Sequence, residues 1–481
     1  MKPNEWNEGL NNVDPDLVEE YIAQKEAYTR KKKNKKPYWF AAVAAVLALA
    51  IGISSIIGGN RSLLANQVAA AEYPQMAQKP NYDDYRNNYD AYSDAYKEWQ
   101  KSQRQQYNQP DGYANSLTDF FYASMAQFLQ GDGNPTYSPL NVYMAMAMLA
   151  ETTGGNSRQQ ILDLFGVDTI VQLREQAGYV WNAHYSDDSE TTLLLANSLW
   201  LDDGYAFNKQ TAQLLADRYY ASSFQGDLGT EKLDKQLQAW LNENTGDLLK
   251  DQAQKVTLDP QTVFALASTV YFTARWDAKF SENNTKDAIF HAPTGDRMTT
   301  FMNKTIIQHT FYWSENFGAI SLELTGENRM WLILPDEGYT TTDILASEDY
   351  LRMTLDPGSW KNKRTFKINL SLPKFDVVSQ MDLIEGMKAM GVTDVFDYTV
   401  SDFTSMTDTP MLYVSQINHA ARVSIDEEGC AAAAFTVTNI APGAMPPPEL
   451  EEIDFVLDRP FLFIVSSRDN LPLFAGVVNE P

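Results

Sequence analysis

One segment, residues 426–440, limits most strongly what this chain can fold into. It reads Asp-Glu-Glu-Gly-Cys followed by four alanines, and it continues into β-branched residues at Thr436, Val437, Thr438 and Ile440. A run of alanines favours helix, whereas alternating β-branched residues favour strand. The segment is therefore a candidate for changing between two conformations.

The same segment is suited to entering a β-sheet. Alternate side chains of a strand point to opposite sides, so one face would carry Cys430, Ala432, Ala434, Thr436, Thr438 and Ile440. This face is small at its leading end, and small side chains enter a packed sheet without overpacking it. No charge and no proline lies between Gly429 and Ala441. Burying a charge would be costly, and a proline would remove a ladder donor.

Composition excludes several classes of function. The formal net charge of −25 argues against nucleic acid and anionic lipid as partners of the bulk of the protein. The single cysteine excludes an internal disulfide. Four scattered histidines show no metal-ligand spacing, so neither a metal site nor a cofactor is expected. The sequence has no G-x-S-x-G elbow, and we do not expect an enzyme.

The N-terminal region predicts a membrane anchor. Residues 1–37 are polar and end in a basic cluster, and residues 38–57 carry no charge. Such a run is long enough for a transmembrane helix, and the basic cluster places residues 1–37 in the cytoplasm and the rest outside. The competing interpretation is a signal peptide cleaved near Ala69-Ala70-Ala71, which would give a secreted protein.

Residues 58–112 are interpreted as an extracytoplasmic spacer rich in Tyr, Gln, Asn and Asp. Aromatic residues recur there at alternating spacings of three and four, which predicts a helix with one aromatic stripe: Tyr82, Tyr85, Tyr89, Tyr92, Tyr96 and Trp99. That helix is either a solvated stalk, a helix laid on the neighbouring domain, or a wall-contacting or self-associating element. Pro110-Asp111-Gly112 then marks a boundary.

Residues 113–481 predict one globular α+β domain. Helical patterns dominate its early part and strand-like runs its later part, an order typical of mostly antiparallel sheets packed with helices. Several motifs in this domain resemble, in order, those of the serpin family: residues 137–141, 195–200, 271–276, 284–287, 372–375, 412–419, 458–463 and 474–476. The resemblance covers the whole domain. The basic and apolar N-terminal runs resemble membrane-anchored proteins of Gram-positive bacteria.

The serpin resemblance implies a fold of helices and three mostly antiparallel β-sheets with an exposed reactive-centre loop. It implies inhibition of an extracellular serine protease, which cuts the loop and is trapped covalently while the loop inserts into the main sheet. The residues that match the loop hinge are Glu427, Glu428, Gly429, Cys430, Ala431, Ala432, Ala433 and Ala434. Those that match the shutter and breach, where the sheet parts, are Ser138, Asn197, His419 and Trp276.

The scissile bond stays open between neighbouring positions. Counting forward from Gly429 places the residue before the cut at Gly443, and counting back from the C-terminal motifs places it at Ala444 or Met445. A proline follows Met445, so the bond after Met445 is the least favoured of the three. Small residues without a nearby Arg or Lys fit elastase-like or subtilisin-like proteases. The alternative function is a non-inhibitory or cysteine-protease-directed serpin, and the domain is expected to be monomeric.

Overall fold

The computed structural model describes residues 66–481 apart from 75, 86–87, 132, 189–190, 260–261, 416 and 431–449. The predicted anchor at 38–57, hinge residues 431–434 and the scissile candidates 443–445 lie outside the described residues. In the part of the chain that is described, no helix is long and apolar enough to cross a bilayer. This part forms one compact unit, Asn66–Pro481.

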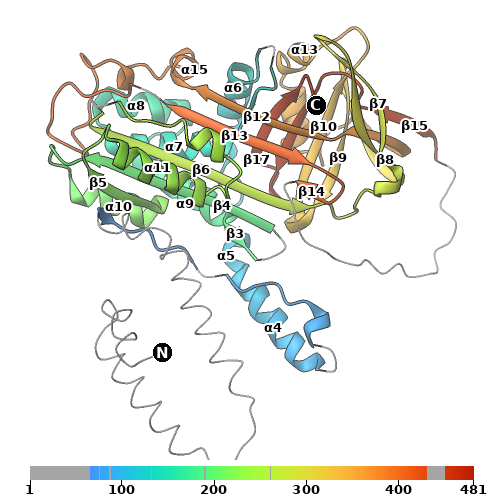
Figure 1. The fold of residues 1–481 in the computed structure, drawn as a ribbon, viewed down its shortest axis with the longest axis horizontal. Coiled ribbons are helices and arrows are strands. Elements are labelled where there is room, and N and C mark those ends of the chain that lie inside the picture. The colour runs from blue at the N-terminus through green and yellow to red at the C-terminus, as the bar shows by residue number, and fades with distance from the viewer. Residues whose placement is uncertain are drawn as a thin grey trace, which may run out of the picture. The chain divides into compact units, whose positions relative to one another are not determined.

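Two β-sheets form the frame of the unit (Figure 1). Sheet A has the order β1-β5-β4-β6-β14-β13-β12, with β3 beside β4; its strands are β1 (Gln67–Ala69), β3 (Ser186–Asp187), β4 (Thr191–Asp202), β5 (Ala221–Gly226), β6 (Phe264–Arg275), β12 (Phe375–Asp382), β13 (Asn418–Ile425) and β14 (Gly429–Cys430). Sheet B has the order β15-β11-β8-β9-β10-β16-β17-β2, with β7 beside β8; its strands are β2 (Thr136–Tyr137), β7 (Lys286–Ala292), β8 (Gly295–Trp313), β9 (Phe317–Leu324), β10 (Asn328–Pro335), β11 (Lys363–Pro373), β15 (Glu452–Val456), β16 (Phe461–Ser466) and β17 (Pro472–Val478).

The expectation of three separate sheets is corrected to two within the described residues. The reason is the length of β8, which runs unbroken for 19 residues. It pairs with β7 and β11 along most of its length, and its last residues, Tyr312 and Trp313, pair with β9. One continuous strand therefore joins what the resemblance implied as two sheets.

Helices cover the sheets and fill the space between them. The α-helices are α4 (Tyr89–Ser102), α5 (Arg104–Tyr107), α6 (Thr118–Phe128), α7 (Pro139–Thr152), α8 (Gly155–Leu164), α9 (Ile170–His184), α10 (Lys209–Tyr219), α11 (Glu231–Glu243), α12 (Lys250–Ala253), α13 (Thr341–Leu345), α14 (Asp349–Leu355) and α15 (Ile384–Ala389). Short 3₁₀ turns are η2 (Tyr82–Tyr85), η3 (Asn115–Leu117), η4 (Glu282–Asn284), η5 (Thr325–Glu327) and η6 (Asp394–Phe396).

Helix α7 lies in the centre of the core. Ser138 caps its N-terminus by accepting a hydrogen bond from the Asn141 backbone N–H, and Pro139 occupies its first turn. Nearly every side chain of α7 is buried, and the helix packs against both β6 of sheet A and β17 of sheet B. A helix that is apolar on all sides is stable only where the protein surrounds it. Helix α7 therefore packs against strands of both sheets.

Residues 66–112 pack onto the same unit. Strand β1 forms the edge of sheet A by pairing with β5. Tyr73 stacks on Trp181 and Tyr220, with ring centroids 6.0 Å apart in each case. The predicted aromatic helix is shorter than its stripe: α4 begins at Tyr89 and is preceded by η2. The rings of Tyr82 and Tyr92 still meet, 5.1 Å apart, so the aromatic side chains cluster between these two elements.

Candidate functional site

The described end of the 426–440 segment lies inside sheet A. Strand β14 pairs with β6 through Gly429 opposite Arg275 and Cys430 opposite Ala274, and with β13 through Cys430 opposite Ile425. Among the described residues, β6 and β13 pair with β14 but nowhere with each other. Gly429 and Cys430 thus occupy a strand position between two long strands (Figure 1).

Residue 429 is a glycine because the neighbouring strand leaves no space for a Cβ atom. A Cβ atom at this position would lie 2.6 Å from the Arg275 Cα and closer still to the Ala274 carbonyl oxygen. Both obstacles are backbone atoms of the neighbouring strand, so they cannot rotate away. Any side chain at residue 429 would force β14 away from β6.

A tight turn carries the chain from β13 into β14. The Asp426 carboxylate accepts hydrogen bonds from the backbone N–H groups of Glu428 (2.8 Å) and Gly429 (3.2 Å). Trp276, the residue directly after β6, donates its indole N–H to the Asp426 carbonyl (2.8 Å) and its backbone N–H to the Glu428 carbonyl (3.0 Å). Trp276 is itself buried. The predicted breach residue therefore binds the turn directly.

Glu427 is the most enclosed acidic residue of this turn. Its carboxylate accepts a hydrogen bond from the Thr285 hydroxyl (2.7 Å) and forms an ion pair with Lys374 (2.6 Å). Burial alone would raise the pKa of this carboxyl, but the bonds from Lys374 and Thr285 lower it overall. Glu428 pairs with Lys279 at a more exposed position. The acidic pair before the glycine thus fixes the turn to two other parts of the chain.

Cys430 faces the core. Its side chain is 3 % exposed, and its partners Ala274 and Ile425 are buried as well. Burial, with a smaller contribution from the charge of Asp426, raises the pKa of the thiol to about 12. The thiolate is the reactive form of cysteine, so this thiol is inert while β14 remains paired.

Ser138 and His419 meet at the start of α7. The Ser138 backbone N–H donates to His419 Nε2 (3.0 Å), and the Ser138 hydroxyl donates to the Leu473 carbonyl (2.6 Å). Complete burial lowers the pKa of His419 to about 4, so the imidazole is neutral at physiological pH. This contact joins α7, β13 of sheet A and the start of β17 of sheet B.

Asn197 does not join that pair in the described residues. It lies on β4, where its side-chain amide donates to the Tyr219 carbonyl (2.7 Å), and its Oδ1 is buried without a hydrogen-bond partner. The structure therefore brings Ser138 and His419 together at the start of α7. It brings Asp426, Glu427 and Trp276 together at the turn between β13 and β14. Asn197 lies apart from both.

Sequence reasoning missed the partners of the turn. Thr285, Lys374 and Lys279 hold the two glutamates, yet nothing in their local sequence marks them as anion-binding residues. The available signal was indirect, because Thr285 and Lys374 both lie in segments that carried the family resemblance. The described residues contain no group of three His, Cys, Asp or Glu side chains that could hold a metal ion.

Comparison with known proteins decides the family. The family model described as "Serpin (serine protease inhibitor)" matches residues 115–481. The chain belongs to the serpin family. Serpin-ZX of Arabidopsis thaliana is 28 % identical over 370 residues, which cover 73 % of this chain and 93 % of that protein. Neuroserpin of Mus musculus is also 28 % identical, over 74 % of this chain and 89 % of that protein.

Solved serpin structures share the fold. The thermophilic serpin tengpin in its native state superposes with a TM-score of 0.69 at 24 % identity, over 78 % of this chain and 95 % of that one. Arabidopsis AtSerpin1 in its native stressed conformation gives a TM-score of 0.66 at 25 % identity, over 77 % and 98 %. Serpins are protease inhibitors rather than enzymes, and the serpin fold expected from the sequence is confirmed.

The rate at which the Cys430 thiol reacts should report how often the turn between β13 and β14 opens. Because the chain has one cysteine, thiol labelling is specific for it. We expect very slow labelling of the native protein by a maleimide. Labelling should be about tenfold faster after Lys374→Ala, since this change leaves the mostly buried Glu427 carboxylate without its cation and makes local opening of the turn easier. The matched control is Lys367→Ala, which removes an exposed ion pair with Glu452. Equal labelling rates in the two variants would contradict this role of Lys374.

Proposed function

We propose that this serpin inhibits extracellular serine proteases, elastase-like or subtilisin-like ones in preference, by covalent trapping with insertion of its reactive loop into sheet A. The observation that carries the proposal is the position of β14, which pairs on both sides between β6 and β13. The residues that follow, 431–434, are four alanines. Small uncharged side chains suit a strand that continues from Cys430 into the same sheet.

The roles of the site residues follow from this proposal. Residues 427–434 form the hinge, with Gly429 giving β14 its close approach to β6. Trp276 secures the turn at the point where insertion begins. His419 lies on β13, one of the two strands that must part, and accepts a hydrogen bond from the Ser138 backbone N–H, whereas Asn197 lies on β4, the strand next to β6. The cut falls after Gly443, Ala444 or Met445. Insertion after cleavage would then carry the attached protease away from its original position.

A direct test is the formation of a covalent complex. The full chain in detergent is mixed with pancreatic elastase, subtilisin, trypsin and papain, and the products are separated after boiling in denaturant. We expect a stable complex with elastase or subtilisin and a released C-terminal fragment that begins at Ala444, Met445 or Pro446. Clean cleavage without any complex would overturn the inhibitory proposal and favour a non-inhibitory serpin. A complex with papain alone would favour a cysteine-protease inhibitor.

We also propose that the serpin domain, residues 113–481, is displayed outside the cell by the anchor at 38–57, with residues 58–112 between them. The support is the charge pattern of the N-terminal region. Cleavage near Ala69-Ala70-Ala71 is the less favoured alternative, because Ala69 belongs to β1 and is paired with Ser223 of β5. Fractionation of cells that express the full chain should find it in the membrane; recovery of a shortened form in the medium would contradict the anchor.

A further inference from the structure

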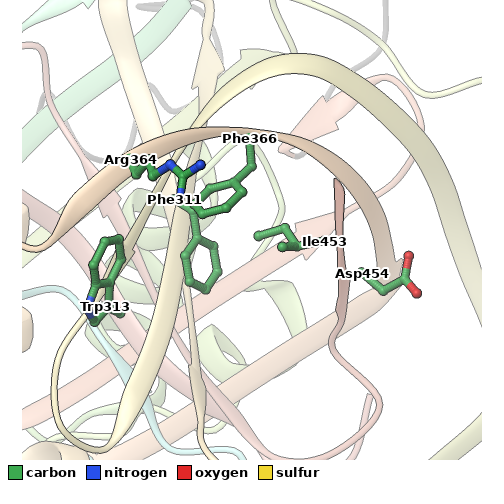
Figure 2. A pocket seen from close by; sticks show the side chains of 6 residues that line it. All are labelled: Phe311, Trp313, Arg364, Phe366, Ile453 and Asp454. Atoms are coloured by element: carbon green, nitrogen blue, oxygen red, sulfur yellow. The ribbon is translucent and has the colours of Figure 1, made fainter. Parts of the chain in front are cut away.

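A cavity lined by aromatic side chains lies beside the strand that follows the reactive loop (Figure 2). Its volume is about 480 Å³, and the residues that line it are Phe311 and Trp313 of β8, Arg364 and Phe366 of β11, and Ile453 and Asp454 of β15. This size and this mainly apolar lining are typical of binding sites. Neither the hinge nor the turn at Asp426 uses this cavity.

The walls of the cavity are aromatic faces held in place by one another. The Phe311 ring is stacked beside Trp313 at 6.3 Å and meets Phe366 edge-on at 6.1 Å. The Arg364 guanidinium lies over the Phe366 ring, 5.0 Å from its centroid. Phe311, Trp313, Phe366 and Ile453 are each only half-buried. The cavity therefore presents rigid apolar surface that the described residues leave partly open to solvent.

The residues at the start of β15 lie beside β11, next to the aromatic lining of the cavity. Strand β15 runs parallel to β11, with Glu452 opposite Lys367 and Ile453 opposite Ile368. One residue earlier, the Glu451 carbonyl accepts a hydrogen bond from the Lys367 backbone N–H (3.0 Å), and its carboxylate forms an ion pair with Arg364 (2.9 Å). If this register continues backwards, residue 449 lies opposite Arg364, and the residues before it reach the aromatic cavity.

The residues immediately before 449 are Pro446-Pro447-Pro448. We propose that this proline run docks into the aromatic cavity. A proline run cannot extend the ladder on β11, because proline has no backbone N–H. It does form a preorganised polyproline II helix, which aromatic-lined grooves bind at little cost in conformational entropy. The run is joined to the rim of the cavity by only a few residues, so its effective concentration there is high.

Docking of this run would secure the C-terminal end of the reactive loop. Strand β15 is the edge of sheet B, and β11 is its only strand partner among the described residues. An anchor just before β15 would oppose its separation from β11. It would also fix the chain directly after the scissile candidates. This inference concerns the far end of the loop and does not rest on inhibition, so the covalent-complex test and the test below can fail separately.

Disulfide trapping in the full chain tests the proposal. In a Cys430→Ser background, Arg364→Cys is combined with Glu449→Cys, because opposite residues in one register come within disulfide reach. We expect rapid cross-linking under mild oxidation, and much slower cross-linking when Arg364→Cys is instead combined with Ala441→Cys. Adding Pro446→Ser, Pro447→Ser and Pro448→Ser, or Trp313→Ala, should slow the 364–449 cross-link at least about fivefold.

The control for Trp313→Ala is Ile307→Ala, an exposed apolar position on the same strand, and it should leave the rate unchanged. The triple serine variant changes only the loop, so it tests the proposal even if Trp313→Ala fails to fold. A cross-link rate that is insensitive to the three prolines would overturn the docking. So would a rise in the melting temperature of the wild-type chain with millimolar indole-3-acetate, since a free molecule would then occupy the cavity.

Discussion

Under the proposed mechanism, replacing Ala432 with glutamate is expected to make this serpin a substrate of its target protease. The pairing of Cys430 with Ala274 and Ile425 fixes the register of an extended β14. Continued into the sheet, that register places residue 432 between Phe272 and Val423, whose side chains are 4 % and 2 % exposed. An uncompensated charge in such a position costs about 3 kcal/mol or more, which corresponds to about 100-fold slower or less complete insertion.

The matched control is Ala433→Glu. The same register places residue 433 beside Arg422 on the opposite face, where the Arg422 side chain is 36 % exposed and is paired with Asp376. A glutamate there gains a cationic neighbour in Arg422. The ratio of covalent complex to cleaved serpin, measured with elastase or subtilisin on denaturing gels, should fall at least tenfold for Ala432→Glu and little for Ala433→Glu. Equal ratios in the two variants would contradict insertion in this register.

Stability in acid should depend strongly on His419. Burial lowers the pKa of His419 to about 4 in the folded protein, whereas an unfolded histidine titrates near 6.5. Between these two values the unfolded chain binds the additional proton. The contribution of neutral His419 to the stability of the folded protein is therefore fully present above about pH 6.5, and it is lost as the pH falls towards 4. The loss over this window amounts to about 3 kcal/mol of unfolding free energy.

His419→Gln separates this effect from the titration of carboxylates. Glutamine does not titrate, and its side-chain oxygen can still accept the hydrogen bond from the Ser138 backbone N–H. Unfolding by urea at several pH values should show a decline between pH 6.5 and 4 that is about 3 kcal/mol smaller in the variant than in the wild type. Parallel curves for the two proteins would show that His419 is not held neutral by the fold.

Local sequence patterns predicted helices and strands best where the apolar residues on one face of the element determine its type. Residues 209–219 carry a helical pattern in the sequence and form α10 (Lys209–Tyr219), and residues 192–201 carry a strand-like pattern and lie within β4. The small residues at 429 and 430 pointed to a strand-forming segment, and both belong to β14. A glycine at a hinge is usually explained by its conformational freedom. The structure instead shows a glycine required by the backbone of β6.

The contacts that escaped prediction connect residues far apart in the chain. Tyr73 was assigned to the spacer because the residues around it are mostly polar, yet it stacks on Trp181. Trp99 was placed in an aromatic stripe, but its indole N–H binds the Asp188 carboxylate (3.0 Å). Glu427 was recognised without Lys374, its partner across the fold. Such pairs depend on tertiary packing, which periodicity along the chain does not encode.

Hydrogen exchange on the two strands that flank β14 tests the central claim most directly. Amide exchange along β6 (Phe264–Arg275) and β13 (Asn418–Ile425) is measured by mass spectrometry in the intact serpin and after cleavage within residues 441–449. Insertion of the cleaved loop would give both strands a new hydrogen-bonded neighbour, so their amides should exchange at least about tenfold more slowly after cleavage. Unchanged exchange on both strands would contradict insertion of the loop between them.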